Sequence, residues 1–394
     1  MQFSQIIGQQ HTIEQLKEMV DNNRLSHALL MIAKEGAGGL PLALAFSNYV
    51  VSQSEKQKPA AAPVMGLFGE EIPPAATTSS HGAELAAQYI HPDIHYSYPV
   101  IPRKSGDKPI STDYISEWRE FIKQYPYGNV YDWLQFIGAE NKQGNITSAE
   151  CADIIRKLNL KSFESEYKIL VLWMPEYLGN EGNKLLKLIE EPPANTLFIL
   201  IAENESLVLP TIVSRCQTIR IPPIETNEVA QALQQRSKLS AEQSNQIAGV
   251  SEGNYREALQ LIQHAEEDWQ SLLRDWLNAI LKTGPVAQVK WVDLISAQGR
   301  EKQKQFLRYF THLLEQSIRL RTMGEENLPL TSTEKDFAHR LNKLCDVSRM
   351  QAITQELDSA AYYIERNANA KLLFMALTIK LYHIIANGTV IDVS

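Results

Sequence analysis

Apolar residues gather in short continuous runs in the first part of the chain. Such runs are typical of central strands in a parallel sheet, because helices cover both faces of these strands. They predict four strands, over residues 28–33, 167–173, 196–202 and 217–221. Helical patterns follow the first run at 41–51 and the second at 183–191, where Pro192 and Pro193 end the helix. This alternation predicts an α/β domain with a parallel sheet over residues 1–222.

Two segments interrupt the alternation. Residues 52–80 are rich in Pro, Ala, Ser and Thr, and we expect a flexible surface insertion there. Residues 99–145 form a second insertion with a cluster of aromatic residues, among them Tyr125, Tyr127, Tyr131 and Trp133. Aromatic clusters can stack on nucleic-acid bases. The interpretation we favour is a folded insertion that buries a small core of its own.

The pattern becomes wholly helical after Pro222 and Pro223. It predicts a small helical domain over residues 223–265 and a helical C-terminal domain over 266–394. The fold class is therefore α/β plus all-α. The predicted helices cover residues 227–235, 241–250, 254–264, 268–281, 302–321 and 351–385.

Composition excludes several classes of protein. Acidic residues outnumber basic ones by 46 to 38, and this holds on both sides of residue 222, which argues against binding of nucleic acid by bulk charge. The cysteines at 151, 216 and 345 suit neither a disulfide framework nor a zinc site, so we expect a protein of the reducing cytoplasm. The apolar run at 372–385 contains Lys380 and falls short of a membrane span.

The segment after the first predicted strand has the shape of a phosphate-binding loop without its charges. A strand, a loop with Gly36 and Gly38, and a helix would point backbone N–H groups at an anion. In the pattern GxxxxGK[ST], however, Gly39 replaces the lysine and Leu40 replaces the hydroxyl residue that holds Mg²⁺. The loop is a degenerate P-loop, and we expect no tightly bound nucleotide. Binding through backbone amides alone stays open.

The second predicted strand has lost the same chemistry. An ATPase of this architecture would end this strand with acidic residues for Mg²⁺ and for the attacking water. Trp173 and Met174 occupy those places. Glu176 is either a displaced acid or, as we favour, a solvated loop carboxylate. Two losses at two expected places argue against autonomous ATP hydrolysis.

Several blocks of residues resemble the clamp-loader AAA+ family of DNA replication. The most specific pair is NKLLKLIEEPP followed by LPTIVSRC about 20 residues later. The similarity is clear over residues 1–50 and 150–260, weak in the helical C-terminus and absent from both insertions. The blocks lie at residues 3–9, 24–28, 91–93, 183–193, 209–216 and 367–373.

The resemblance implies an architecture and a set of partners. The α/β domain would be an AAA+ domain, residues 223–265 a helical lid, and residues 266–394 a helical collar that joins the subunits of a hetero-oligomer. Gamma/tau-type ATPase subunits and a delta-type subunit would be the partners, with a sliding clamp and primed DNA reached through this part of the DNA polymerase III holoenzyme. One apolar helix face in the collar either contacts a partner or is buried within the domain, and both interpretations stay open. This face is formed by Phe306, Phe310, Leu313 and Leu314.

The resemblance also implies roles for single residues. The motif Ser214, Arg215, Cys216 resembles the arginine finger of clamp loaders, which reaches into the ATP site of the neighbouring subunit. A guanidinium suits that role, since its forked donors and permanent charge stabilise developing phosphate charge. Arg256 resembles the lid arginine that contacts nucleotide in active relatives. Because it faces a degenerate loop, we expect a structural or interface role for it.

These inferences predict a non-hydrolysing clamp-loader subunit that supplies Arg215 in trans, with ATP bound by its neighbour. Many bacterial members of the family carry a four-cysteine zinc module, but residues 51–92 contain no cysteine, so zinc is not expected. Two alternatives remain. One is a self-sufficient AAA+ ATPase with an unconventional nucleotide site, and the other is a purely structural scaffold of the loader.

Overall fold

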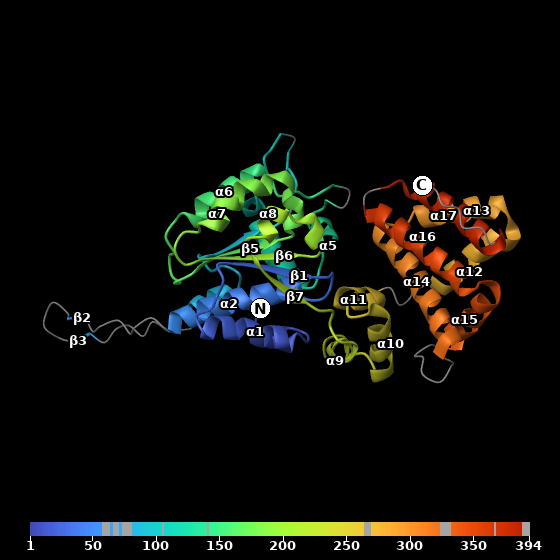
Figure 1. Ribbon diagram of the computed structural model, residues 1–394, viewed down its shortest axis with the longest axis horizontal. Coiled ribbons are helices and arrows are strands. Elements are labelled where there is room, and N and C mark those ends of the chain that lie inside the picture. Colours follow the sequence, from blue (N-terminus) through green and yellow to red (C-terminus); the bar gives the residue numbers. More distant parts are fainter. Residues whose placement is uncertain are drawn as a thin grey trace. The chain divides into compact units, whose positions relative to one another are not determined.

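The computed structural model divides into two compact units, Met1–Gln260 and Leu261–Ser394 (Figure 1). Most of the predicted insertion at 52–80 lies outside the described residues, so that prediction is not tested. The structure describes residues 1–56, 64–65, 71–72, 81–104, 106–139, 142–263, 269–323, 332–365 and 368–387.

The first unit is built on a five-stranded parallel sheet with the order β4-β5-β6-β1-β7. The four predicted strands are confirmed, with β5 beginning one residue later than expected. The edge strand β4 was missed because it has only four residues. The strands are β1 (Ala28–Ala33), β4 (Ile94–Ser97), β5 (Lys168–Trp173), β6 (Thr196–Ala202) and β7 (Gln217–Ile221). A separate antiparallel pair joins β2 (Val64–Met65) to β3 (Glu71–Ile72).

Helices cover both faces of the sheet, as the continuous apolar runs require (Figure 1). Alternate strand residues serve opposite faces: Leu29 and Met31 of β1 pack with α1 (Gln10–Asp21) and α2 (Gly39–Lys56). Leu30 packs on the other face, in the core that the remaining helical elements share. These elements are α6 (Ser148–Leu158), η3 (Pro175–Leu185), α7 (Leu186–Glu190) and α8 (Pro210–Val213). Shorter elements of this unit are η1 (Phe3–Gln5), α3 (His81–Ala87) and η4 (Glu205–Leu207).

The aromatic segment at 99–145 does not bury a core of its own, so that prediction was wrong. Trp118 and Trp133 are fully buried with ring centroids 5.3 Å apart, and Trp118 lies 5.2 Å from Trp173 at the end of β5. Large rings let the segment extend the core of the sheet beyond the end of the strand. Burial of Trp133 and Tyr127 also removes them from any base-stacking surface. The segment forms η2 (Ser111–Tyr114), α4 (Ile115–Gln124) and α5 (Val130–Phe136).

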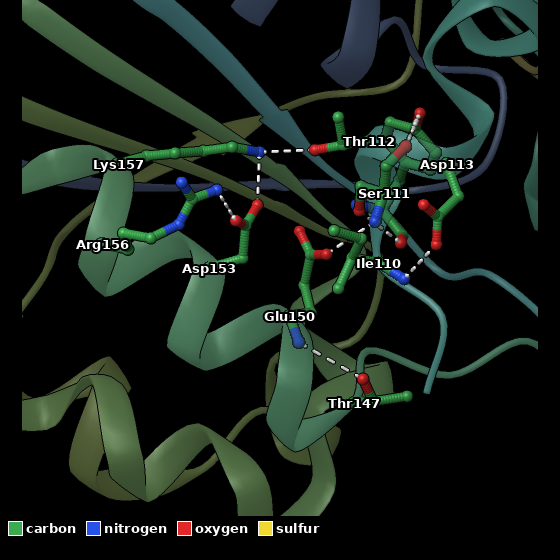
Figure 2. A network of polar contacts seen from close by, with 10 residues as sticks. Ile110, Ser111, Thr112, Asp113, Thr147, Glu150, Asp153, Arg156 and Lys157 are labelled. Carbon is green, nitrogen blue, oxygen red and sulfur yellow. Dashed lines mark hydrogen bonds and ion pairs between the residues drawn. The ribbon is translucent and has the colours of Figure 1, made fainter. Parts of the chain in front are cut away.

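A polar network ties η2 to α6 (Figure 2). The buried carboxylate of Glu150 accepts the backbone N–H of Ser111 at 2.6 Å, and Lys157 donates to the hydroxyl of Thr112 at 2.6 Å. Asp153 pairs with Lys157 and with Arg156, each at 2.5 Å. The network fixes the aromatic segment on the helix layer of the sheet.

The predicted lid forms three helices: α9 (Thr226–Ser237), α10 (Ala241–Ser251) and α11 (Tyr255–Gln263). The boundary between the two units falls within α11, after Gln260. A chain reversal brings α11 back to the sheet domain. The backbone N–H of Tyr255 donates to the carbonyl of Gly36 at 3.2 Å, which places the start of α11 against the glycine loop.

The second unit is wholly helical where the structure describes it. The predicted helix over 351–385 is divided in two, because the side chain of Asn369 accepts the N–H of Leu372 and begins a new helix. Its elements are α12 (Trp269–Asn278), η5 (Ala279–Thr283), α13 (Pro285–Ser296), α14 (Arg300–Met323), α15 (Ser332–Leu344), α16 (Val347–Glu365), α17 (Ala370–Tyr382) and η6 (His383–Asn387).

The structure bears on two expectations for this unit. The face formed by Phe306, Phe310, Leu313 and Leu314 is fully buried in the core of the unit, so it is an internal face and not a contact for a partner. By length and composition alone Ala370–Asn387 could span a membrane, with a mean hydropathy of 1.2, so our prediction for 372–385 was too strict. Core packing still accounts for many of its apolar residues, among them Phe374, Leu377 and Leu381.

Candidate functional site

The glycine loop lies between β1 and α2, as the sequence predicts. Gly36 and Gly38 have φ of 70° and 94°, which glycine adopts without strain, and α2 begins directly at Gly39. Gly39 has no room for a side chain. A Cβ at this position would lie 2.7 Å from the Cβ of Ala33 and 3.1 Å from a methyl group of Ile201. The place of the missing lysine is therefore filled by the core of the sheet.

The lid covers the glycine loop from the other side. A Cβ at Gly36 would lie 1.8 Å from the side-chain oxygen of Asn254, so the asparagine sits directly on the loop. Gln9 adds a second tie, because its side-chain amide donates to the carbonyls of Ala37 at 3.3 Å and of Pro222 at 2.6 Å. The loop thus contacts Asn254 of the lid and is joined through Gln9 to Pro222, which directly precedes the lid.

Arg256 is the centre of an ion-pair network at this place. Its side chain is 4% exposed, and its Nη1 donates to Glu35 at 3.0 Å. Its Nε and Nη2 donate to the two carboxylate oxygens of Asp132 at 2.5 and 2.7 Å. Asn129 and Asn254 complete the network by donating to Glu35 at 3.0 and 3.4 Å. Arg256 therefore joins the lid to the loop and to α5.

The residues around the loop do not fit ATP. The carboxylate of Glu35 would repel phosphates, Arg256 is already paired with two carboxylates, and Gly39 supplies no ammonium. Lys34, the lysine that the loop does contain, is exposed. The structure places the predicted residues Gly36, Gly38, Gly39 and Arg256 together, but it surrounds them with protein groups.

The end of β5, where an ATPase of this architecture would carry catalytic acids, is also occupied by buried side chains. Trp173 and Met174 are buried in the core. Glu176 is not the solvated carboxylate that we predicted, because its Oε1 accepts the backbone N–H groups of Glu203 at 2.6 Å and Asn204 at 2.9 Å. Burial raises the pKa of this carboxyl. Its position makes Glu176 a link between the ends of β5 and β6.

Arg215 lies in the turn between α8 and β7, with its side chain 33% exposed. Its Nε donates to Glu190 at 2.5 Å, and its Nη1 donates to the carbonyl of Thr211 at 2.7 Å. Ser214 is exposed and donates to the same carbonyl at 3.2 Å. Cys216 is half-buried, and burial raises its pKa to about 11, so its thiol is protonated at neutral pH.

Arg215 and the glycine loop lie at opposite ends of the parallel strands β7 and β1. Strand β7 runs parallel to β1, with Gln217 opposite Leu29 and Ile221 opposite Ala33. Arg215 therefore stands at the amino end of these strands, whereas the loop follows their carboxyl end. The four residue steps from Leu29 to Ala33, which separate the two ends of β1 in this pairing, correspond to roughly 13 Å. Arg215 is not placed to act on the loop of its own chain.

Sequence reasoning missed three acidic residues of these sites. Glu35 and Asp132 pair with Arg256, and Glu190 pairs with Arg215. Glu190 was within reach of the sequence, since it lies in the most specific motif block. Asp132 carried no such signal, because it lies in the aromatic segment. Across the described part of the chain, no group of three or more His, Cys, Asp or Glu residues could hold a metal ion.

Comparisons with known proteins show the family to which the chain belongs. The profile of the family described as DNA polymerase III, delta subunit, matches residues 8–225. The delta' subunit of Escherichia coli K12 is 23% identical over 389 residues, which cover 96% of each chain. The delta' subunit of Bacillus subtilis 168 is 28% identical over 123 residues, 31% of this chain and 37% of that protein.

Among solved structures, a gamma subunit-related protein from Thermotoga maritima aligns over 94% of this chain and 98% of its own, with 15% identity and a TM-score of 0.38. The family match covers more than half of the chain, including the loop and the Arg215 motif. This chain therefore belongs to the DNA polymerase III delta subunit family, among relatives that are delta' subunits.

Proposed function

We propose that this chain is a subunit of the loader that places a sliding clamp on primed DNA. It does not hydrolyse ATP, and it supplies Arg215 in trans to the ATP site of a neighbouring subunit. Its relatives include subunits named delta', tau and gamma of DNA polymerase III, which supports gamma/tau-type and delta-type subunits as its partners. The proposal places the chain in the cytoplasm.

The observation that carries the proposal is a contrast between two arginines. Arg256 is buried and paired with two carboxylates beside the chain's own loop. Arg215 is partly exposed at the amino end of these parallel strands, beyond reach of the loop, which follows their carboxyl end. An arginine in this position can serve only a site outside its own loop. This supports a role in trans.

The chemistry of a guanidinium suits the proposed role. Its planar fork and permanent charge stabilise negative charge that develops on a transferred phosphoryl group. Arginine fingers supplied in trans raise turnover by about 10³–10⁵ in GTPases. The closed loop of this chain would keep it from competing for ATP. Its contribution would therefore be fixed presentation of Arg215.

The test is ATP hydrolysis by the reconstituted loader, stimulated by sliding clamp and primed DNA, with wild-type chain, Arg215→Ala and Arg215→Lys. Assembly is checked by gel filtration. Both variants should lower turnover and clamp loading in an intact complex, since lysine keeps the charge but loses the fork. Arg220→Ala is the matched control, because Arg220 is exposed and pairs with Glu205.

The possible outcomes separate the alternatives. Arg220→Ala should leave turnover unchanged. If Arg215→Ala also leaves turnover and clamp loading unchanged in an intact complex, the chain is a scaffold and the proposal fails. Turnover of ATP by the isolated chain would instead support a self-sufficient ATPase.

A further inference from the structure

Glu190 holds the guanidinium of Arg215 in one orientation. Its Oε1 accepts the Nε–H at 2.5 Å and also pairs with Nη2. Nη1 donates to the carbonyl of Thr211 at 2.7 Å and lies 3.3 Å from the hydroxyl of Ser214. All three nitrogens are therefore engaged by groups of the chain itself. One Nη2–H is left over from these bonds for an acceptor outside the chain.

The elements that carry this pair are anchored in the core. Glu190 is the last residue of α7, and the preceding Ile189 is 1% exposed. Ile212 of α8 is fully buried in the same cluster. Gly182 lies in η3, which continues directly into α7, and it lets η3 approach α8 closely, since a Cβ there would lie 2.9 Å from Leu209 and 3.1 Å from Ile212. The separation of Glu190 from Arg215 is thus set by packing.

Stability does not explain the pair. The side chains of Arg215 and Glu190 are 33% and 46% exposed, and ion pairs at such sites contribute little to folding. An arginine that is unpaired at the surface samples many rotamers. A carboxylate oxygen that accepts from both Nε and Nη2 removes most of that freedom. The pair's main effect is therefore on where Arg215 points.

We propose that Glu190 is the positioning residue for Arg215: its carboxylate orients the guanidinium for presentation to a triphosphate bound by a neighbouring subunit. This inference rests on the proposed function in trans. Glu190 touches no substrate and acts only through Arg215. It affects the step that Arg215 accelerates, and it leaves affinity of the neighbouring site for ATP unchanged.

The experiment compares Glu190→Ala, Glu190→Gln and Arg215→Ala chains in the reconstituted loader, with kcat and KM for ATP measured separately. The Arg215-dependent part of turnover is the difference between wild type and Arg215→Ala. Glu190→Ala should reduce this part of kcat about tenfold, since small misplacements of a catalytic group have effects of this order or larger. KM should not change. Glu190→Gln should lie between wild type and Glu190→Ala, because its amide oxygen still accepts from Nε.

Two controls separate positioning from a general effect. Glu191→Ala removes the neighbouring carboxylate, which is exposed, and should match wild type. The double variant Glu190→Ala with Arg215→Ala should match Arg215→Ala alone, because Glu190 has no target once the guanidinium is gone. Gel filtration and thermal unfolding should show an intact complex and an unchanged midpoint for each variant.

The results distinguish this inference from the proposed function beneath it. If Arg215→Ala lowers turnover but Glu190→Ala equals wild type, or raises turnover, Glu190 does not position the finger and only this inference is lost. Additive losses in the double variant would overturn it equally. If Arg215→Ala itself has no effect in an intact complex, the proposed function fails, and the role of Glu190 fails with it.

Discussion

Arg256 binds Asp132 through both carboxylate oxygens, with donor–acceptor distances of 2.5 Å from Nε and 2.7 Å from Nη2. The two residues are 124 positions apart in the sequence. A third member, Glu35, belongs to the glycine loop itself. The lid is therefore held to the sheet domain beside the glycine loop.

The ion-pair network should contribute measurably to stability. Arg256→Ala leaves the carboxylates of Glu35 and Asp132 close together without their shared cation. We expect a loss of about 2–4 kcal/mol in the free energy of unfolding, because removing one partner of a buried pair is strongly destabilising. Urea unfolding measures the loss, and faster hydrogen exchange in α11 locates it.

A surface ion pair provides the control for this prediction. Arg340 pairs with Asp336 across one turn of α15, with side chains 72% and 61% exposed. Arg340→Ala should change the free energy of unfolding by no more than about 0.5 kcal/mol. Equal effects of Arg256→Ala and Arg340→Ala would show that the buried network does not hold the lid.

Restoring a lysine in the loop should not restore nucleotide binding. Gly39→Lys places a Cβ 2.7 Å from the Cβ of Ala33, and Glu35 still occupies Arg256. The variant should bind no ATP in calorimetry. The steric part of the effect is isolated by Gly39→Ala, which should lose about 1–3 kcal/mol of stability through overpacking.

The matched substitution for the steric effect is Gly249→Ala in α10. A Cβ at Gly249 meets no atom within 4 Å, so alanine should stabilise the helix by about 0.5–1 kcal/mol. Opposite signs for the two alanine variants are expected in urea unfolding. Tight ATP binding by Gly39→Lys would mean that the loop lacks only an ammonium group, and that our account of its closure is wrong.

Local patterns were enough to predict the sheet and the shape of the loop. Buried parallel strands have continuous apolar runs, and β1 and β6 follow the predicted bounds. Edge strand β4 is too short for such a signal. The pairing of Arg256 with Asp132 could not be predicted, because the contact depends on how α5 and α11 meet in space. The aromatic segment was misread for the same reason, since periodicity does not say which core a buried ring joins.

Two neighbouring carboxylates of α6 should affect stability with opposite dependence on pH (Figure 2). Burial raises the pKa of Glu150 above 4.5, and the N–H bond from Ser111 only partly opposes this. The contribution of Glu150 to the free energy of unfolding is therefore fully present below pH 4.5, and it is lost as the pH rises through the pKa of Glu150 in the folded protein. Glu150→Gln keeps the acceptor without the charge. It should be more stable than wild type at neutral pH, and the advantage should vanish in acid.

Asp153 behaves in the opposite way. Burial tends to raise its pKa, but hydrogen bonds from Lys157 and Arg156 outweigh burial, and the pKa of Asp153 lies below its ordinary value of 3.8. The contribution of Asp153 to the free energy of unfolding is present above pH 3.8, and it is lost as the pH falls through the pKa of Asp153 in the folded protein. Asp153→Asn should therefore destabilise the protein at neutral pH and approach wild type in acid. Urea unfolding across acidic and neutral pH tests both carboxylates, and curves of the same sign would refute the assignment.

The core of the second unit contains a buried polar contact that can be tested by itself. The indole N–H of Trp276 donates to the hydroxyl of Thr378 at 3.0 Å, and both residues are fully buried. Thr378→Val leaves the indole N–H without an acceptor, which should lower the free energy of unfolding by about 1–3 kcal/mol. Thr354→Val in α16 is the control, because that hydroxyl only bonds the carbonyl of Met350, and its effect should stay within about 0.5 kcal/mol. Calorimetry of the two variants decides the point: equal shifts would mean that loss of a helical threonine, and not the stranded indole, accounts for the change.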